Sequence, residues 1–281
     1  MLNYYIVDAF TDRPFGGNTA GVVLLAEEDF PSEDLMQHVA AELRYSETVF
    51  VRRQAEGDYH LRYFTPCGEV ELCGHATVAT FALLHRLGLA HGTCRCRTLA
   101  GNLEVVASDE VLMQMATPRI VRTLTEDETV DVYRSVGIEG YRPELPVVIS
   151  YAGLPDIMLP VPSGMLDALH PDMDAVAALT DRVGCISIHA FALCNRDGIT
   201  ARVRDFAPAC GVPEESATGT ANASLAHALR EFGVVAPDAT CRFLQGEAMG
   251  RPSVVMAQLS ADGQVRIGGR AALVAQGTLM V

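Results

Sequence analysis

Glu47, Cys73 and His75 are the first candidates for proton-transfer chemistry in this chain. Glu47 lies in the segment SETVF, whose other residues are typical of a strand. A carboxylate in an apolar strand near a helix dipole can have its proton affinity tuned for general acid–base catalysis. The alternative is a glutamate at a strand edge that faces solvent. We therefore predict Glu47 as the catalytic acid/base and keep the surface interpretation beside it.

A helix predicted over residues 75–87 could bind an anion at its N-terminus. Its apolar residues fall on every side of the helical wheel, which predicts a helix buried all round. The first N–H groups of a helix have no partner within it, and Gly74 and His75 stand at this entrance. His75 could donate a hydrogen bond to a substrate, relay a proton, or only cap the helix.

Cys73 offers a different chemistry, because a thiol at a helix N-terminus can have a lowered pKa. Two facing thiolates could act as bases on opposite faces of an amino-acid α-carbon. The position that matches Cys73 in the second half of the chain is Thr218. A single thiol cannot perform that symmetric mechanism.

The second half of the sequence repeats the plan of the first. Each half has an F-x-P turn, then a helix entrance that contains glycine, then a helix that ends at another glycine. From Gly74 to Gly88 there are 14 positions, and from Gly219 to Gly233 there are also 14. The second small-residue helix is expected over 220–232.

A strand of the second half is expected to match the strand of Glu47. Aligning residues 46–50 with residues 187–191 places apolar Ile188 opposite Glu47. The halves would then share a scaffold but differ in chemistry.

The entrance of the second helix could supply binding groups. Thr220 takes the place of His75 and could donate to the same ligand. Glu214 and Glu215 precede the helix, and one of them could bind a substrate amine. The alternative is a carboxylate that only complements the helix dipole.

These patterns predict an α+β chain of two similar halves, 1–117 and 118–281, with Pro118 near the boundary. Each half would be a strand-rich shell around one buried helix, and the final strand could pack back on the N-terminal half. Both helix N-termini would face a shared cleft, a favoured place for a small-molecule site.

Composition excludes several classes of partner. The formal net charge is −14 over 281 residues, which argues against nucleic acid and anionic membrane surfaces. The eight cysteines include no CxxC pair, so we read them as free thiols of a cytoplasmic protein and expect no metal site. P-loop, GxGxxG and GxSxG motifs are missing, and no cofactor is expected.

Several motifs together resemble the phenazine-biosynthesis isomerase (PhzF-like) family. They run in that family's order from about Ile6 to about Ser253: VDAFTDRPFGGNTAGVVL, SETVF, YFTP, ELCGHAT, FAP, GVPEESATGTA and QGEAMGRPS. The resemblance implies the diaminopimelate-epimerase fold, in which each of two pseudo-symmetric halves is a mostly antiparallel, barrel-like sheet around a central helix. It also implies a homodimer that needs no cofactor.

The resemblance implies roles for individual residues. Glu47 falls on the family's catalytic acid/base, and the substrate-binding positions fall on Asn18, Gly74, His75, Glu215, Gly219 and Thr220. Glu215-Ser216 stands where the family usually has Asp-Pro, a change that bears on substrate choice. Thr220 replaces a serine and keeps its hydroxyl.

Three hypotheses follow. The first is a cofactor-independent isomerase that moves a proton within a small cyclic or amino-acid-like acid, as in isomerisation of trans-2,3-dihydro-3-hydroxyanthranilate. The second is a racemase or epimerase that uses Cys73 with another base. The third is a non-catalytic small-molecule binder, because a fold does not fix a function.

Overall fold

The computed structural model describes residues 1–26 and 29–281 and contains two compact units. Residues 1–114 and 268–281 form unit 1, and residues 115–267 form unit 2. The mixture of helices and strands confirms the predicted α+β class. The domain boundary expected near residue 117 stays a prediction.

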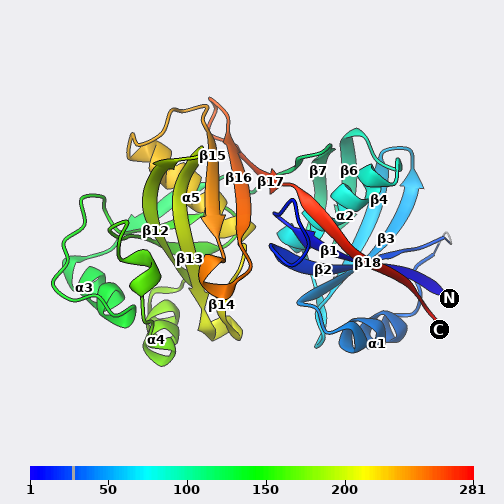
Figure 1. Ribbon diagram of the computed structural model, residues 1–281, viewed down its shortest axis with the longest axis horizontal. Coiled ribbons are helices and arrows are strands. Elements are labelled where there is room, and N and C mark those ends of the chain that lie inside the picture. Colours follow the sequence, from blue (N-terminus) through cyan, green and yellow to red (C-terminus); the bar gives the residue numbers. More distant parts are fainter. Residues whose placement is uncertain (27–28) are drawn as a thin grey trace. The chain divides into compact units, whose positions relative to one another are not determined.

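Unit 1 contains a surface helix, a buried helix and a set of short strands (Figure 1). The helices are α1 (Glu33–Leu43) and α2 (Gly74–Arg86). The strands are β1 (Leu2–Ala9), β2 (Asn18–Leu24), β3 (Glu47–Ala55), β4 (Asp58–Phe64), β5 (Glu69–Val70), β6 (Gly92–Thr98), β7 (Gly101–Ala107), β8 (Val111–Gln114) and β18 (Ala271–Leu279).

Unit 2 has the same kinds of element with one additional α-helix. Its helices are α3 (Glu126–Ser135), α4 (Met173–Val183) and α5 (Gly219–Glu231), with short 3-10 turns η1 (Leu166–Ala168), η2 (Pro208–Cys210) and η3 (Glu247–Met249). Its strands are β9 (Arg119–Thr123), β10 (Val148–Tyr151), β11 (Pro155–Pro160), β12 (Ser187–Arg196), β13 (Ile199–Ala207), β14 (Val212–Glu215), β15 (Thr240–Gln245) and β16 (Ser253–Leu259). Strand β17 (Val265–Gly269) lies where the chain passes from unit 2 back to unit 1.

The predicted repeat is present in the strand pairing of the two units. In unit 1, β1 and β2 are antiparallel, β2 and β3 parallel, β3 and β4 antiparallel, and β4 and β6 parallel. In unit 2 the same alternation runs through β10, β11, β12, β13 and β15. Most of the remaining pairs are antiparallel, as the sequence predicted.

A buried helix occupies the centre of each unit. Helix α2 packs against β1, β2, β3, β7, β8 and β18, and nine of its residues are buried. Helix α5 packs against β9, β10, β11 and β16, and ten of its residues are buried. The expectation of helices buried all round is therefore confirmed.

The strand register corrects one alignment made from the sequence. Thr48 pairs with Phe64 in unit 1, and Ile188 pairs with Phe206 in unit 2. Because the two phenylalanines are matched by their F-x-P turns, Ile188 corresponds to Thr48. Ser187 rather than Ile188 therefore corresponds to Glu47. A slip of one residue along a strand moves every side chain to the opposite face, so this correction changes which groups are compared.

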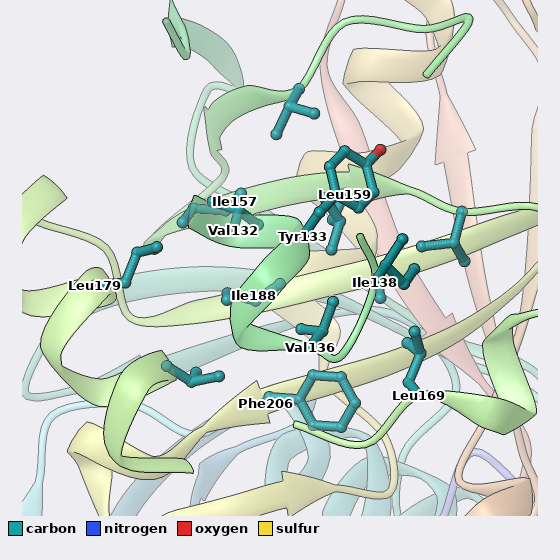
Figure 2. Close-up of a cluster of buried hydrophobic side chains, with 14 of the residues drawn as sticks. Val132, Tyr133, Val136, Ile138, Ile157, Leu159, Leu169, Leu179, Ile188 and Phe206 are labelled. Atoms are coloured by element: carbon teal, nitrogen blue, oxygen red, sulfur yellow. The ribbon is translucent and has the colours of Figure 1, made fainter. Parts of the chain in front are cut away.

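Helices α3 and α4, which the sequence reading did not assign, build a second layer on unit 2. Figure 2 shows Val132, Tyr133 and Leu179 from these helices in one buried cluster with the strand residues Leu159 and Ile188. A capping box at Thr125 starts α3, and Asp172 caps α4 by accepting from the Ala175 N–H. This layer covers the face of β11 and β12 that points away from α5.

Within residues 1–26 and 29–281, no helix is both long and apolar enough to cross a membrane.

Candidate active site

Glu47 and His75 are brought into direct contact in unit 1. Glu47 opens β3, where it lies beside Ala20 of the parallel strand β2, and His75 is the second residue of α2. Glu47 Oε2 lies 3.1 Å from His75 Nε2, and the two side chains are 18% and 7% exposed. The strand thus places a carboxylate at the N-terminus of the buried helix.

Three further side chains surround the imidazole ring. Ser46 Oγ is 3.2 Å from His75 Nε2, while Cys73 Sγ is 3.3 Å from His75 Nδ1. Asn18, the first residue of β2, places its amide nitrogen 3.4 Å from the same Nδ1 atom. The predicted residues Asn18, His75 and Glu47 therefore share one site, and Ser46 joins them.

The electrostatics of this site favour a charged pair. Burial is the largest single effect and would raise the pKa of Glu47, but interactions with His75, Ser46 and Cys73 together outweigh burial and lower the pKa below its usual value. Ser46 and Cys73 add smaller contributions in the same direction. A glutamate in this setting is a carboxylate at neutral pH and is ready to accept a proton.

His75 shows the complementary shift. Burial of the ring would lower its pKa, but interactions with Cys73 and Glu47 raise the pKa of His75 well above its usual value. The imidazolium form can donate from both ring nitrogens, one toward Glu47 and one toward Cys73. The ion pair with His75 therefore stabilises the neighbouring carboxylate.

Cys73 is buried enough to stay protonated. Burial raises the pKa of the Cys73 thiol, an effect that the His75 charge opposes only in part. A thiol at a helix N-terminus can have a lowered pKa, but for Cys73 the effect of burial is larger than that of its position. A neutral thiol is a poor base for abstracting a proton from carbon.

The entrance of α2 is open to a ligand at its backbone. Cys73 is the N-cap, and its side chain makes no capping hydrogen bond. A Cβ atom added to Gly74 would meet only Met113 Sδ, at 4.0 Å. The structure therefore has room at Gly74 for a bound group, although the fold itself does not require glycine there.

The same three residues are also able to hold a metal. Ligand atoms of Glu47, Cys73 and His75 lie within 4.8 Å of one another, and carboxylate, thiolate and imidazole are all zinc ligands. Binding would require the thiol to lose its proton and the carboxylate to leave its histidine partner. The expectation of no metal site stays a prediction.

The entrance of α5 in unit 2 carries the other predicted binding residues. Glu215 ends β14, Gly219 begins α5, and Thr220 follows it. Glu215 Oε2 is 2.9 Å from Thr218 Oγ1. Glu214, the other acid considered from the sequence, instead forms a bidentate pair with Arg204 at 2.8 and 2.9 Å.

A buried polar cluster behind the α5 entrance was missed by the sequence reading. It consists of Asp156, Ser187, His189, Asp205, Asn222 and Gln245, each at most 2% exposed. The available signal was the polar residues inside otherwise apolar strands: a serine and a histidine in SIHAF, and an aspartate directly before the F-A-P turn. No single spacing rule connects these strands, so only the fold brings the residues together.

Known proteins similar to this chain are isomerases. The family described as phenazine biosynthesis-like protein matches residues 7–277. The uncharacterized isomerase YddE of Escherichia coli (strain K12) is 34% identical over 263 residues, covering 89% of this chain and 88% of that protein. A trans-2,3-dihydro-3-hydroxyanthranilate isomerase of Pseudomonas chlororaphis is 32% identical over 296 residues and covers both chains completely.

Solved structures give the same fold. A PhzF-family phenazine biosynthesis protein of Bacillus anthracis matches with a TM-score of 0.86 at 24% identity, covering 100% of this chain and 99% of that one. A probable proline racemase of Agrobacterium radiobacter matches with a TM-score of 0.63 at 13% identity, covering 100% and 93%. The predicted diaminopimelate-epimerase-like fold is confirmed, as is the prediction of an isomerase. The chain therefore belongs to the phenazine biosynthesis-like family, the PhzF family of isomerases.

Proposed function

We propose that this protein moves a proton from one carbon to another within a small cyclic or amino-acid-like acid, with Glu47 as the acid/base. The observation that carries the proposal is the buried contact between Glu47 and His75 at the entrance of α2. The substrate type is that of the Pseudomonas chlororaphis relative, trans-2,3-dihydro-3-hydroxyanthranilate.

Glu47 would act first as a base and then as an acid. The carboxylate takes a proton from an sp³ carbon, and the electrons of the broken C–H bond enter the adjacent double-bond system. The same Glu47 then returns its proton to another carbon of that system, where a new C–H bond forms. The product is an isomer of the substrate, so atoms and electrons balance without a co-reactant.

Substrate binding in unit 1 is proposed for the α2 entrance. The backbone N–H groups that follow Cys73, including those of Gly74 and His75, can bind a carboxylate at the positive end of the helix. Asn18, whose amide nitrogen lies 3.4 Å from His75 Nδ1, is proposed to contact the ligand from β2.

Glu215, Gly219 and Thr220 are proposed substrate-binding residues of unit 2. Gly219 and Thr220 repeat the helix entrance formed by Gly74 and His75, and Glu215 is the candidate partner of a substrate amine. Glutamate is one methylene longer than the aspartate usual in the family. We therefore expect a substrate whose amine lies at a different depth from that of the relative's substrate. The homodimeric state and the cytoplasmic location expected from the sequence stay predictions.

A racemase that uses Cys73 is the second candidate. It is favoured by the 3.3 Å contact between Cys73 Sγ and His75 Nδ1, which could activate the thiol. The raised pKa of Cys73 and the hydroxyl of Thr218 at the matching position oppose it. The third hypothesis, a binder without activity, predicts ligand binding with no exchange of carbon-bound protons.

The test is turnover of trans-2,3-dihydro-3-hydroxyanthranilate in deuterated water by the wild type, Glu47→Gln and the matched control Glu42→Gln. Glu42 lies exposed on α1, away from the site. We expect Glu47→Gln to lose roughly 10²- to 10⁴-fold in rate while the control keeps wild-type activity. Equal rates for wild type and Glu47→Gln would remove Glu47 from the acid/base role.

A further inference from the structure

Three carboxyl groups in unit 2 are joined in a row by two hydroxyl groups. Asp156 Oδ1 lies 2.9 Å from Ser187 Oγ, which lies 2.7 Å from Asp205 Oδ1. The other oxygen of Asp205 lies 2.7 Å from Thr218 Oγ1, which lies 2.9 Å from Glu215 Oε2. We call these five residues the carboxyl chain.

Backbone groups fix the orientation of the amides beside the carboxyl chain. Gln245 Oε1 accepts from the Thr218 N–H, and Gln245 Nε2 donates to the Glu215 carbonyl and to Thr218 Oγ1. Asn222 Nδ2 donates to the Thr218 carbonyl and to Gln245 Oε1, so both of its hydrogens are used. If either side-chain amide were rotated by 180°, its oxygen would face a backbone carbonyl oxygen, and both atoms would be acceptors.

This orientation determines one proton of His189. Asn222 Oδ1 can only accept, and it lies 3.2 Å from His189 Nε2, so that nitrogen carries a hydrogen. The other ring nitrogen, Nδ1, lies 3.1 Å from Asp205 Oδ1. Asp205 is thus approached by three neighbours: Ser187, His189 and Thr218.

The two bridging hydroxyls have too few hydrogens for three carboxylates. Ser187 Oγ carries one hydrogen but lies between two carboxyl oxygens, so it can donate to only one of them. Thr218 Oγ1 is in the same position and also accepts from Gln245. At each bridge the second carboxyl must therefore supply a proton, or two buried lone pairs would face each other below 3 Å.

We infer that the carboxyl chain holds two protons, one at each bridge, and that Asp156 is a buried carboxylic acid. One proton on Asp205 could satisfy only one bridge, because its two oxygens face different hydroxyls. At least two protons are therefore spread over the three carboxyl groups.

The surroundings of Asp156 support the neutral form. Its Oδ2 atom is buried and has no hydrogen-bond partner in the described residues, which a carbonyl oxygen tolerates far better than a charged one. Burial first, and then the one negative charge that Asp205 and Glu215 share, raise the pKa of Asp156 well above its usual value. The thiols Cys185 and Cys210 also lie near Asp156, and the imidazole of the cluster, His189, contacts Asp205 Oδ1 at 3.1 Å.

The position of the second proton determines whether Glu215 is neutral or negatively charged, and this proton can move within the bridge without exchange with solvent. When Thr218 donates to Asp205, the proton of this bridge is on Glu215. When Glu215 passes that proton to Thr218 Oγ1, the threonine's own hydrogen moves to Asp205 Oδ2 and Glu215 becomes a carboxylate. A cationic amine at Glu215, as in the proposed function, would favour this second state. The protonation of Asp156 itself is independent of the proposed function and can be tested without substrate.

The test compares Asp156→Asn with the matched control Asp238→Asn, an exposed aspartate that makes the same change in charge. Asparagine can donate to Ser187 as a carboxylic acid does, so Asp156→Asn should fold. In the wild type, a folded pKa above the unfolded value stabilises the protein at low pH, and this stability is lost as pH rises toward the folded value. The ratio of the unfolding constants of wild type and Asp156→Asn should then rise by up to tenfold per pH unit above about pH 4.

A second measurement reports the proton directly. The infrared spectrum of substrate-free protein with ¹³C-labelled aspartate carboxyls should contain a protonated-carboxyl band at pH 7. The band should shift in deuterated water, fall in Asp156→Asn and stay in Asp238→Asn. Absence of the band in the wild type, or a ratio of unfolding constants that does not change with pH between 5 and 8, would overturn the inference.

Discussion

Glu47 Oε2 lies 3.1 Å from His75 Nε2, so the first residue of a strand is in ion-pair contact with the second residue of the buried helix α2. This contact helps to lower the pKa of Glu47, and Cys73 together with Glu47 raises the pKa of His75, in each case against the effect of burial. The pair therefore keeps a base ionised although its side chain is largely buried.

Replacing His75 with asparagine should move the acid limb of the pH–activity profile to higher pH. The wild-type carboxylate should stay ionised to below pH 4.5, its usual pKa, because His75, with smaller contributions from Ser46 and Cys73, outweighs burial. Without the histidine, burial remains and raises the pKa of Glu47, so activity is lost earlier as pH falls. The measurement is kcat/KM against pH for both proteins. An acid limb that does not move would show that His75 does not set the charge of Glu47.

Cys73 should prove dispensable for the isomerase reaction. Its raised pKa keeps the thiol neutral, so Cys73→Ala should retain activity within about tenfold of wild type, far above the loss expected for an acid/base residue. Alkylation experiments need Cys67 and Cys210 replaced by serine first, because both are exposed and would react before Cys73. Loss of activity in Cys73→Ala comparable to that in Glu47→Gln would favour the racemase hypothesis.

Gly74 and Gly219 should be required for binding and not for folding. A Cβ atom added to Gly74 would lie 4.0 Å from Met113 Sδ and meet nothing else within 4 Å. A Cβ atom added to Gly219 would lie 3.6 Å from the side chain of Ile267. Alanine also favours a helix by up to about 1 kcal/mol over glycine. Gly74→Ala and Gly219→Ala should therefore keep or raise the Tm but increase KM by roughly tenfold or more, because the added methyl group would displace the charged ligand from a hydrogen bond with the backbone N–H groups.

Gly17→Ala is the contrasting variant for that experiment. Gly17 has a φ of +63°, and a Cβ there would lie 2.0 Å from the carbonyl oxygen of Ala9. This variant should lose stability, because the backbone conformation and the contact both exclude a side chain. If the helix-entrance variants destabilise the protein as much as Gly17→Ala does, the glycines have a structural role.

Zinc should inhibit the enzyme by competing for the Glu47, Cys73 and His75 side chains. The metal would withdraw the proposed base and would release the thiol proton, so inhibition should strengthen as pH rises. A chelator should restore full activity, and Cys73→Ala should weaken inhibition by about tenfold or more. Loss of activity on chelation alone would instead indicate a metal-dependent reaction.

Local patterns were enough to predict the buried helices and the strand that carries Glu47. Helix α2 was expected over 75–87 and runs from Gly74 to Arg86, because apolar residues on all faces and the glycine after it are signals within one segment. The contact of His75 with Glu47 was expected only through the repeat. Ser46 was not singled out, because a serine just before a strand gives no signal of its partner.

The register and the carboxyl chain could not be read from the sequence. Whether Ser187 or Ile188 is the equivalent of Glu47 in unit 2 depends on which residue pairs with Phe206. That pairing is a long-range property of the sheet. Asp156 and Asp205 meet only because β11, β12 and β13 lie side by side. Buried acids in strands otherwise resemble exposed ones in the sequence.

Deuterium incorporation from solvent into the product tests the central claim most directly. The wild type should place solvent deuterium at the carbon that receives the proton, since the proton held by Glu47 exchanges with solvent before it is returned to the substrate, and Glu42→Gln should do the same. In Glu47→Gln both isomerisation and incorporation should fall together, by roughly 10²-fold or more. Isomerisation by Glu47→Gln at the wild-type rate would contradict the account.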